Sequence, residues 1–226
     1  SIPVQMPAYA RSLQVVAQGP RRGVLGEHGF DGLAVGSADA LHAVTIGESP
    51  LGLTLLRDIA GLPIPGHNDC TEVRAVRVES LLPAALPDAW FGWSSVDLVV
   101  WRRPDPSALT PEQQAALRGW VLAGGTLVVS LGDDWRILDA SPLRDLLGVD
   151  LAPGGPSSSA TEAVLLVARQ SAAEAPPALP IVSMRPQPRA VPRVVGLDGP
   201  LVVDHRPGAG RVVTLAFDLE AGELRG

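Results

Sequence analysis

The sequence contains no lysine, so all 18 of its cationic side chains are arginine. Schiff-base chemistry and Walker-type phosphate loops both use a lysine amine, and the composition therefore excludes both kinds of site. The formal net charge is −6 over 226 residues. Since phosphate neutralisation needs a basic face, this acidic balance argues against nucleic acid as a partner.

Cysteine and long apolar runs are also scarce. Cys70 is the single cysteine, so an internal disulfide is excluded and cysteine usage leaves the compartment undetermined. No stretch reaches the roughly 18 apolar residues of a membrane helix, and the start lacks the pattern of a signal peptide. We therefore expect no membrane span within this chain. Its start at Ser1 is consistent with a piece of a longer protein.

Residues 96–135 carry the clearest structural signal. Residues 97–101 form a near-continuous apolar strand, typical of a parallel sheet buried on both faces. Thr110 and Gln113 form a capping box around a proline at the first helical position, and a Gly-Gly pair ends that helix. Residues 126–130 then return as a second strand. This βαβ crossover predicts an α/β fold.

The flanking sequence predicts further elements and a domain boundary. We expect a β-rich N-terminal segment over 1–40 and an α/β domain over 41–226, with a loop-rich insertion at about 151–195. Further strands are expected at residues 43–46, 72–78, 163–169, 200–204 and 211–218, and a helix after Ser49 in the run LGLTLLRDIA. The strand at 72–78 alternates in polarity and is expected near an edge, and the last two strands should form a hairpin.

Four segments of the chain resemble a known family. They are LPDAWFGW at 86–93, LTPEQ at 109–113, WVLAGGTLVV at 120–129 and GAGRVV at 208–213. Together they are similar to the class I glutamine amidotransferase-like domain, particularly its non-catalytic versions in bacterial membrane-anchored proteins. The resemblance implies a flavodoxin-like, doubly wound, mostly parallel sheet with a C-terminal antiparallel hairpin. It also implies an extracytoplasmic location, with membrane tethers outside this chain.

The same resemblance bears on activity. Active members of the family carry a nucleophilic cysteine in the turn after the strand at 126–130, and Ser130 stands at that position here. Cys70 lies in a different loop, and His205, the only downstream histidine, falls within the expected hairpin. The resemblance therefore implies no catalytic residue, and we expect a pseudoenzyme without a cofactor.

Polar side chains follow several of the expected parallel strands. In an open parallel sheet, ligands bind beyond the carboxyl ends of the strands near a topological switch point. The candidate ligand-binding residues at these ends are Glu48, Ser49, Arg102, Arg103, Ser130, Asp133, Asp134 and Trp135. They would combine an anion-accepting helix start, an arginine fork and two carboxylates. The alternative is ordinary strand-end polarity, with Ser49 and an aspartate merely capping helices.

Two other clusters contain residue types that can serve a function. His67, Asp69, Cys70 and Glu72 crowd one loop, but their spacing matches no common metal motif, so we predict no metal site. The aromatic run at 90–93 is interpreted mainly as a plug against the sheet. An exposed cluster there would instead bind sugar or a partner protein.

Three functional hypotheses follow from the sequence. The first is a non-catalytic binding or interaction module of a larger bacterial cell-envelope protein, with a protein or a small molecule as its ligand. The alternative is a hydrolase or metal-dependent enzyme that uses Glu48, Asp133 and Asp134. A third hypothesis is homo-oligomerisation through the surface at residues 90–93.

Overall fold

The computed structural model describes residues 12–18, 20, 24–31, 40–53, 76–168 and 176–224. Most of the helix expected after Ser49 and the loop that carries His67 and Cys70 lie outside these residues. The chain divides into two compact units, with the boundary in the sequence between Ala40 and Leu41. The N-terminal unit contains an antiparallel hairpin of β1 (Ser12–Gln18) and β2 (Val24–Asp31).

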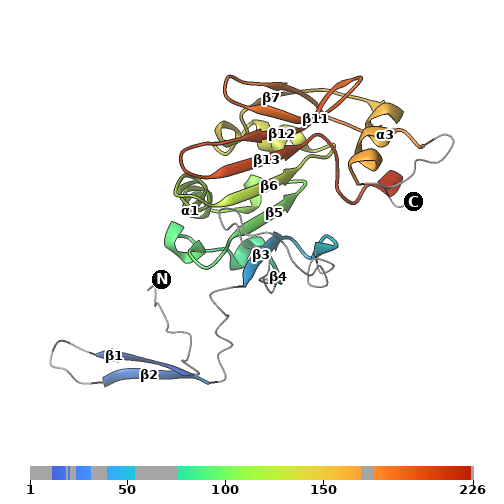
Figure 1. Ribbon diagram of the computed structural model, residues 1–226. Helices are drawn as coiled ribbons and strands as arrows, with labels where there is room; N and C mark the ends of the chain where they lie inside the picture. Colours follow the sequence, from blue (N-terminus) through green and yellow to red (C-terminus); the bar gives the residue numbers. More distant parts are fainter. Residues whose placement is uncertain are drawn as a thin grey trace, which may run out of the picture. The chain divides into compact units, whose positions relative to one another are not determined.

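A seven-stranded sheet forms the centre of the second unit (Figure 1). Its strands are β3 (Leu41–Ile46), β4 (Val76–Leu81), β5 (Leu98–Arg102), β6 (Thr126–Ser130), β11 (Val191–Gly196), β12 (Gly199–His205) and β13 (Arg211–Leu215). Their order is β11-β12-β13-β6-β5-β3-β4. The five strands from β13 to β4 are parallel, and β11 and β12 extend the sheet in antiparallel fashion.

Taken in chain order, the parallel strands follow the flavodoxin-like order 2-1-3-4-5. β4 lies at the edge of the sheet, as its alternating sequence predicted. β12 and β13 form the expected antiparallel hairpin. The mostly parallel α/β sheet predicted from sequence is thus confirmed.

The predicted crossover connects β5 to β6 through α1 (Pro111–Leu122). The Thr110 hydroxyl accepts the Gln113 N–H at 3.2 Å, and the Gln113 side chain accepts the Thr110 N–H at 3.0 Å. Gln113 also donates to the carbonyls of Pro83 and Leu86, each at 2.9 Å. The capping box therefore starts the helix, and its glutamine also holds the segment at 83–86, just before the aromatic run, against the helix start.

Shorter elements surround the sheet. They are α2 (Trp135–Asp139), α3 (Ser158–Val167), β7 (Val149–Ala152), β8 (Pro156–Ser157), β9 (Leu179–Pro180), β10 (Ser183–Pro186) and the 3-10 helices η2 (Pro83–Ala85), η3 (Trp90–Trp93), η4 (Pro106–Ala108), η5 (Arg144–Leu146) and η6 (Gly222–Leu224). β7 pairs with β10, and β8 with β9, both antiparallel. In the described parts of the chain, no helix combines the length and apolar character needed to cross a membrane.

The strand expected at 163–169 was wrong, because this apolar run belongs to α3. The Ser157 hydroxyl accepts the Ala160 N–H at 3.0 Å and so caps the helix. A short apolar run fits a buried strand or a helix equally well, and here the serine cap upstream decides between them.

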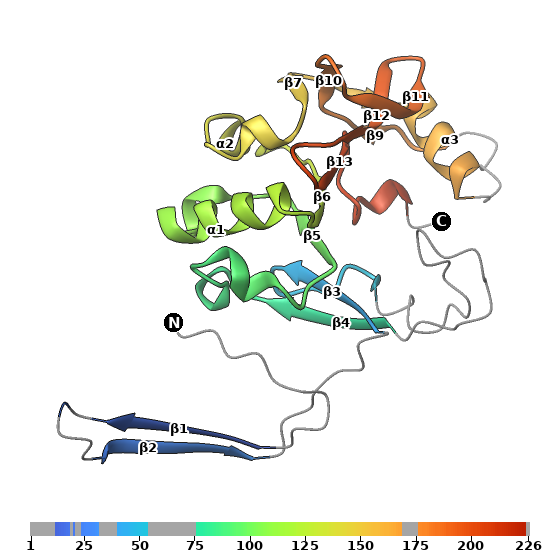
Figure 2. The ribbon, with the colours of Figure 1, turned by 60° about the vertical axis from the view of Figure 1, so that its left-hand side comes forward.

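The main core lies between α1, α2 and one face of the sheet (Figure 2). Leu117 and Val121 of α1 are fully buried against this face. The aromatic run at 90–93 divides: Trp93 is 1% exposed and stacks at 5.7 Å on Trp120, whereas Trp90 is 55% exposed. The aromatic side chain that packs into the core is therefore Trp93. Trp90 is the tryptophan of this run that remains available for contacts at the surface.

Candidate functional site

The switch point of the parallel sheet lies between β3 and β5, the first and third parallel strands. Ser49 follows β3, and Arg102 ends β5 at the same edge. The segment that follows β13 reaches this edge, and Figure 1 shows it in red at the end to which the parallel arrows point. Residues 217–220 of this segment contact the side chains that the sequence proposed as ligand-binding.

Arg102 holds this C-terminal segment with its whole guanidinium group. Its Nε and one terminal nitrogen donate to the Asp218 carboxylate, the latter at 2.6 Å, and the other terminal nitrogen lies 2.9 Å from the Glu220 carboxylate. Ser49 Oγ donates to the second Glu220 oxygen at 3.1 Å. The fork that was expected to bind a ligand is therefore occupied by two carboxylates of the chain itself.

The charges in this network shift one another's titration. The hydrogen bond to Asp218 raises the pKa of Arg102, although burial opposes this. Burial raises the pKa of Asp218, but the hydrogen bonds and the charge of Arg102 outweigh it and hold that pKa below its usual range. Asp218 and Glu220 were not among the predicted site residues. Their position just after the last parallel strand was the signal that would have identified them.

Ser130 is fully buried at the end of β6. Its hydroxyl donates to the Phe217 carbonyl at 2.9 Å and accepts the Leu219 N–H at 2.9 Å. Both partners are backbone groups, and no imidazole or carboxylate within the described residues bonds to this oxygen. The hydroxyl proton is donated to a carbonyl, and among the described residues no side chain is placed to remove it as a general base would.

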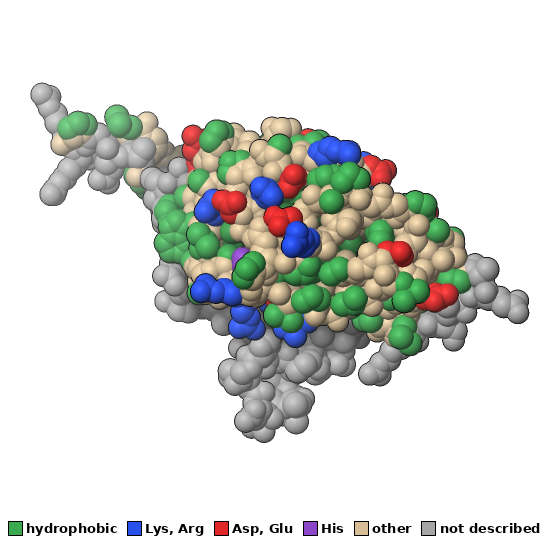
Figure 3. All heavy atoms as spheres, turned by 90° about the horizontal axis from the view of Figure 1, so that it is seen from above, with side chains coloured by type: hydrophobic (Ala, Val, Ile, Leu, Met, Phe, Trp, Pro, Cys, Tyr) green, Lys and Arg blue, Asp and Glu red, His purple; other side chains and the backbone are tan. Residues whose placement is uncertain are grey.

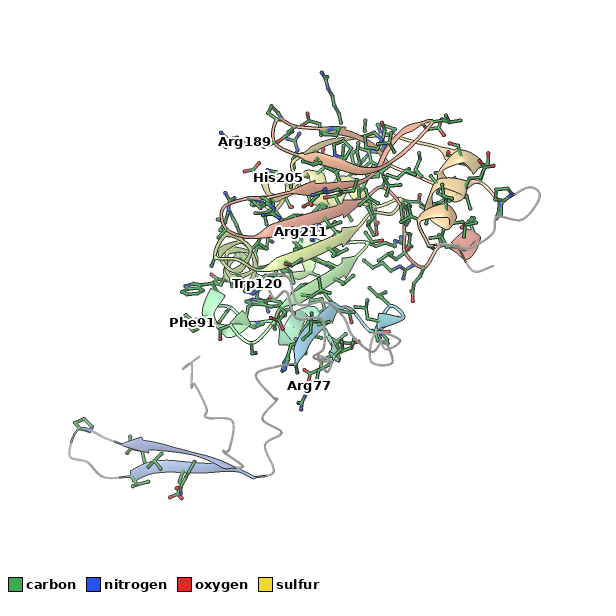
Figure 4. All side chains as sticks on the ribbon, in the orientation of Figure 1. Arg77, Phe91, Trp120, Arg189, His205 and Arg211 are labelled. Carbon is green, nitrogen blue, oxygen red and sulfur yellow. The ribbon has the colours of Figure 1, made fainter. Side chains whose placement is uncertain are left out.

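His205 lies far from Ser130 along the strands. It pairs with Val212 at the start of β13, which in turn pairs with Leu127 near the start of β6. Ser130 instead pairs with Leu215 at the other end of β13. The His205 ring approaches the Leu146 carbonyl at 3.0 Å (Figure 4). The two side chains thus lie at opposite ends of the parallel strands.

A cavity of about 420 Å³ opens beside the C-terminal segment, beyond the carboxyl end of β6. It is lined by Arg103, Leu131, Gly132, Asp133, Trp135, Arg136, Pro153, Gly154, Pro180, Ile181, Val182, Asp218, Ala221 and Glu223. Its walls come from the residue after β5, the β6–α2 loop, the start of α2, the segment after β7, the end of β9 with the β9–β10 connection, and the segment after β13. Three predicted site residues, Arg103, Asp133 and Trp135, lie in this wall.

Arg103 is held in a defined position at the cavity wall. Its backbone has a φ of 44°, a left-handed conformation that costs energy for a residue with a side chain. Its N–H donates to the Ser130 carbonyl at 2.7 Å, and its guanidinium contacts both Asp134 oxygens at 3.3 and 3.4 Å. The aliphatic part of the Arg103 side chain passes over Gly132, and a Cβ added to Gly132 would lie 2.8 Å from Arg103 Cγ.

The predicted residues therefore separate into three groups. Ser49, Arg102 and Ser130 bind the C-terminal segment; Arg103, Asp133, Asp134 and Trp135 lie at or beside the cavity; Glu48 is exposed and lines neither place. Within the described residues, no group of three or more histidine, cysteine, aspartate or glutamate side chains is arranged to hold a metal ion.

A scan against protein-family models and a search of the curated proteins both found no match. Solved structures are similar in fold. A cytoplasmic protein of Salmonella typhimurium LT2 is 16% identical with a TM-score of 0.57, and the match covers 80% of this chain and 89% of that protein. A second cytoplasmic protein of Salmonella typhimurium is 12% identical with a TM-score of 0.53, covering 92% and 85%.

An exo-β-1,4-mannosidase from an Opitutaceae bacterium is 21% identical with a TM-score of 0.44. That match covers 66% of this chain and 25% of the mannosidase, so the chain spans a quarter of that enzyme's length. At these identities the likeness to the solved structures is one of fold alone.

Proposed function

We propose that this chain is a non-catalytic binding module, with the cavity beside β6 as its ligand site. The observation that carries the proposal is the state of Ser130. Its hydroxyl is fully buried and bonded to two backbone groups, so the position of the family's nucleophile serves to attach the C-terminal segment. A cavity lined by both charged and apolar side chains remains open next to it and offers room for a small molecule.

The enzymatic alternative needs carboxylates that act together. Asp134 is paired with Arg103, Asp133 is exposed at the cavity, and Glu48 lies outside it. A general acid and base must both reach one substrate. Of the three carboxylates that this alternative uses, only Asp133 lines the cavity without an ion pair among the described residues, and this supports the binding module over the hydrolase or metal-dependent enzyme.

The setting of the module belongs to the same proposal. The segments at 86–93, 109–113, 120–129 and 208–213 resemble the non-catalytic glutamine amidotransferase-like domains of bacterial membrane-anchored proteins. We accordingly place the chain within a larger cell-envelope protein. The gene sequence on either side tests this placement: membrane-spanning segments in the same reading frame support it, and a complete open reading frame without them contradicts it.

Turnover assays test the non-catalytic assignment. The wild-type chain and Ser130→Ala are assayed for esterase, amidase and glutaminase activity, with and without a divalent cation. We expect background rates from both proteins. Ser94→Ala is the matched control, because Ser94 is an exposed serine on the same chain. Turnover that is lost in Ser130→Ala, with circular dichroism unchanged and Ser94→Ala fully active, would refute the proposal.

The same assay tests the alternative enzyme. Asp133→Asn and Asp134→Asn are compared with Asp105→Asn, a change to the N-cap aspartate of η4, which does not line the cavity. Cation-dependent turnover that disappears only in the first two variants would establish the hydrolase or metal-dependent enzyme instead.

A further inference from the structure

The cavity lining includes charged side chains that form no ion pair with another described residue. Arg136 lies over the Trp135 ring at 4.8 Å and forms no ion pair within the described residues. Asp133 and Glu223 likewise have no hydrogen-bond or ion-pair partner in the described part of the chain. Within the described part of the chain, one cation and two carboxylates around the same cavity are thus left without an ion pair and are available to contact a ligand.

The charge of the surroundings restricts that ligand. The cavity and its ion-pair partners contain Arg102, Arg103, Arg136, Asp133, Asp134, Asp218, Glu220 and Glu223. Three arginines against five carboxylates leave a local net charge of −2, which disfavours an anion. Two of the three arginines, Arg103 and Arg136, line the cavity itself and oppose the entry of a cation. A neutral ligand meets neither penalty.

The lining also restricts the ligand's functional groups. Guanidinium groups only donate hydrogen bonds, and ionised carboxylates only accept them. A ligand that contacts both kinds of group must therefore accept hydrogen bonds from the first and donate them to the second. A hydroxyl group donates and accepts at once. The remaining wall is apolar, with Leu131, Ile181 and Val182 among its members, and suits the C–H surface of such a ligand.

We propose that the cavity binds a neutral polyhydroxy compound of about monosaccharide size. The inference rests on the proposed function, since it assumes a binding site in which no bond is broken. Asp133 and Glu223 accept hydrogen bonds from ligand hydroxyls, and Arg136 donates to ligand oxygens. The volume of about 420 Å³ falls within the range of small-molecule sites.

Isothermal titration calorimetry and ligand-observed NMR with D-glucose, D-galactose and D-mannose test the proposal. We expect saturable binding of at least one sugar with a Kd on the order of 1 mM or tighter. Glu223→Gln and Arg136→Met should each weaken it at least about tenfold, because each removes a charged hydrogen-bond partner. The matched controls are Glu162→Gln on α3 and Arg118→Met on α1, which lie outside the cavity.

The comparison probes are glycine for a zwitterion, succinate for an anion and putrescine for a cation. No binding of any of the three sugars, or sugar binding that Glu223→Gln and Arg136→Met leave unchanged, overturns the inference. Binding of a comparison probe in place of the sugars, lost in those variants, also overturns it but keeps the binding module. Chemical conversion of a bound probe, detected by NMR, would instead refute the non-catalytic function.

Discussion

Arg102 and Asp218 form a two-bond ion pair across the carboxyl edge of the sheet, 116 residues apart in the chain. Together with Ser130, this pair attaches the C-terminal segment over the strand ends where open α/β sheets bind their ligands. The switch point itself is thereby filled by the chain, and the open cavity lies to one side of it, next to Arg103.

Removing the Arg102 charge should loosen the C-terminal segment. Arg102→Met leaves Asp218 and Glu220 without their shared cation, and we expect a loss of about 2 kcal/mol in the free energy of unfolding. Hydrogen–deuterium exchange at the Leu219 amide should become faster. Arg136→Met is the control, because Arg136 has no ion pair within the described residues. Unchanged exchange at Leu219 in Arg102→Met would contradict the attachment.

Ser130 should be a stabilising residue. Ser130→Ala leaves the Phe217 carbonyl and the Leu219 N–H without their partner in a buried place, which costs about 1–3 kcal/mol. Urea unfolding followed by tryptophan fluorescence measures the change. The exposed Ser94→Ala should differ from wild type by less than about 0.5 kcal/mol. Equal stability of the two variants would mean that these hydrogen bonds contribute nothing.

Two adjacent glycines should respond differently to the same substitution. A Cβ at Gly154 would overlap the Ile181 carbonyl, which is backbone and part of the cavity wall, whereas a Cβ at Gly155 meets no atom within 4 Å. We expect Gly154→Ala to lose about 1–3 kcal/mol through overpacking, and Gly155→Ala to stay close to wild type. Thermal unfolding of both variants provides the measurement. A Gly154→Ala protein as stable as Gly155→Ala would show that this wall can move.

Asp204 should make stability depend on pH. It is 3% exposed on β12 and accepts hydrogen bonds from Arg193 and Arg211, the closest at 2.7 and 2.9 Å respectively. Burial raises its pKa, but the two arginines outweigh burial and hold the pKa below its usual range. A lowered folded-state pKa stabilises the protein above the unfolded value of about 3.9, and this contribution disappears as the pH falls through the folded value.

Asp204→Asn should therefore cost about 3 kcal/mol at pH 7, and the difference from wild type should shrink steadily below about pH 4. Chemical unfolding at a series of pH values tests this. Asp150→Asn is the control, because Asp150 is half exposed in its ion pair with Arg144. Figure 3 shows such arginine and carboxylate side chains interspersed on one face of the molecule. A difference that is constant between pH 7 and pH 3 would rule out the ionic role of Asp204.

Local signals in the sequence were enough to locate the crossover. The capping box at Thr110 and Gln113 and the glycine pair that follows the helix act within a few residues, so their effect is legible without the fold. The run at 163–169 was different, because its apolar pattern fits a strand or a helix and the Ser157 cap decided the outcome. The difference in burial between Trp90 and Trp93 could not be predicted from the sequence either, since it depends on how η3 packs against α1.

The sequence by itself determined the chemical identity of the strand ends: a serine in place of the nucleophile, an arginine pair, and aspartates after β6. The tertiary structure alone decided which of these groups face a ligand. Asp218 and Glu220 reach Arg102 and Ser49 because the last parallel strand brings them to the same edge, through contacts more than 100 residues apart. Such long-range pairing depends on strand order and register, and neither is written in the spacing of neighbouring residues.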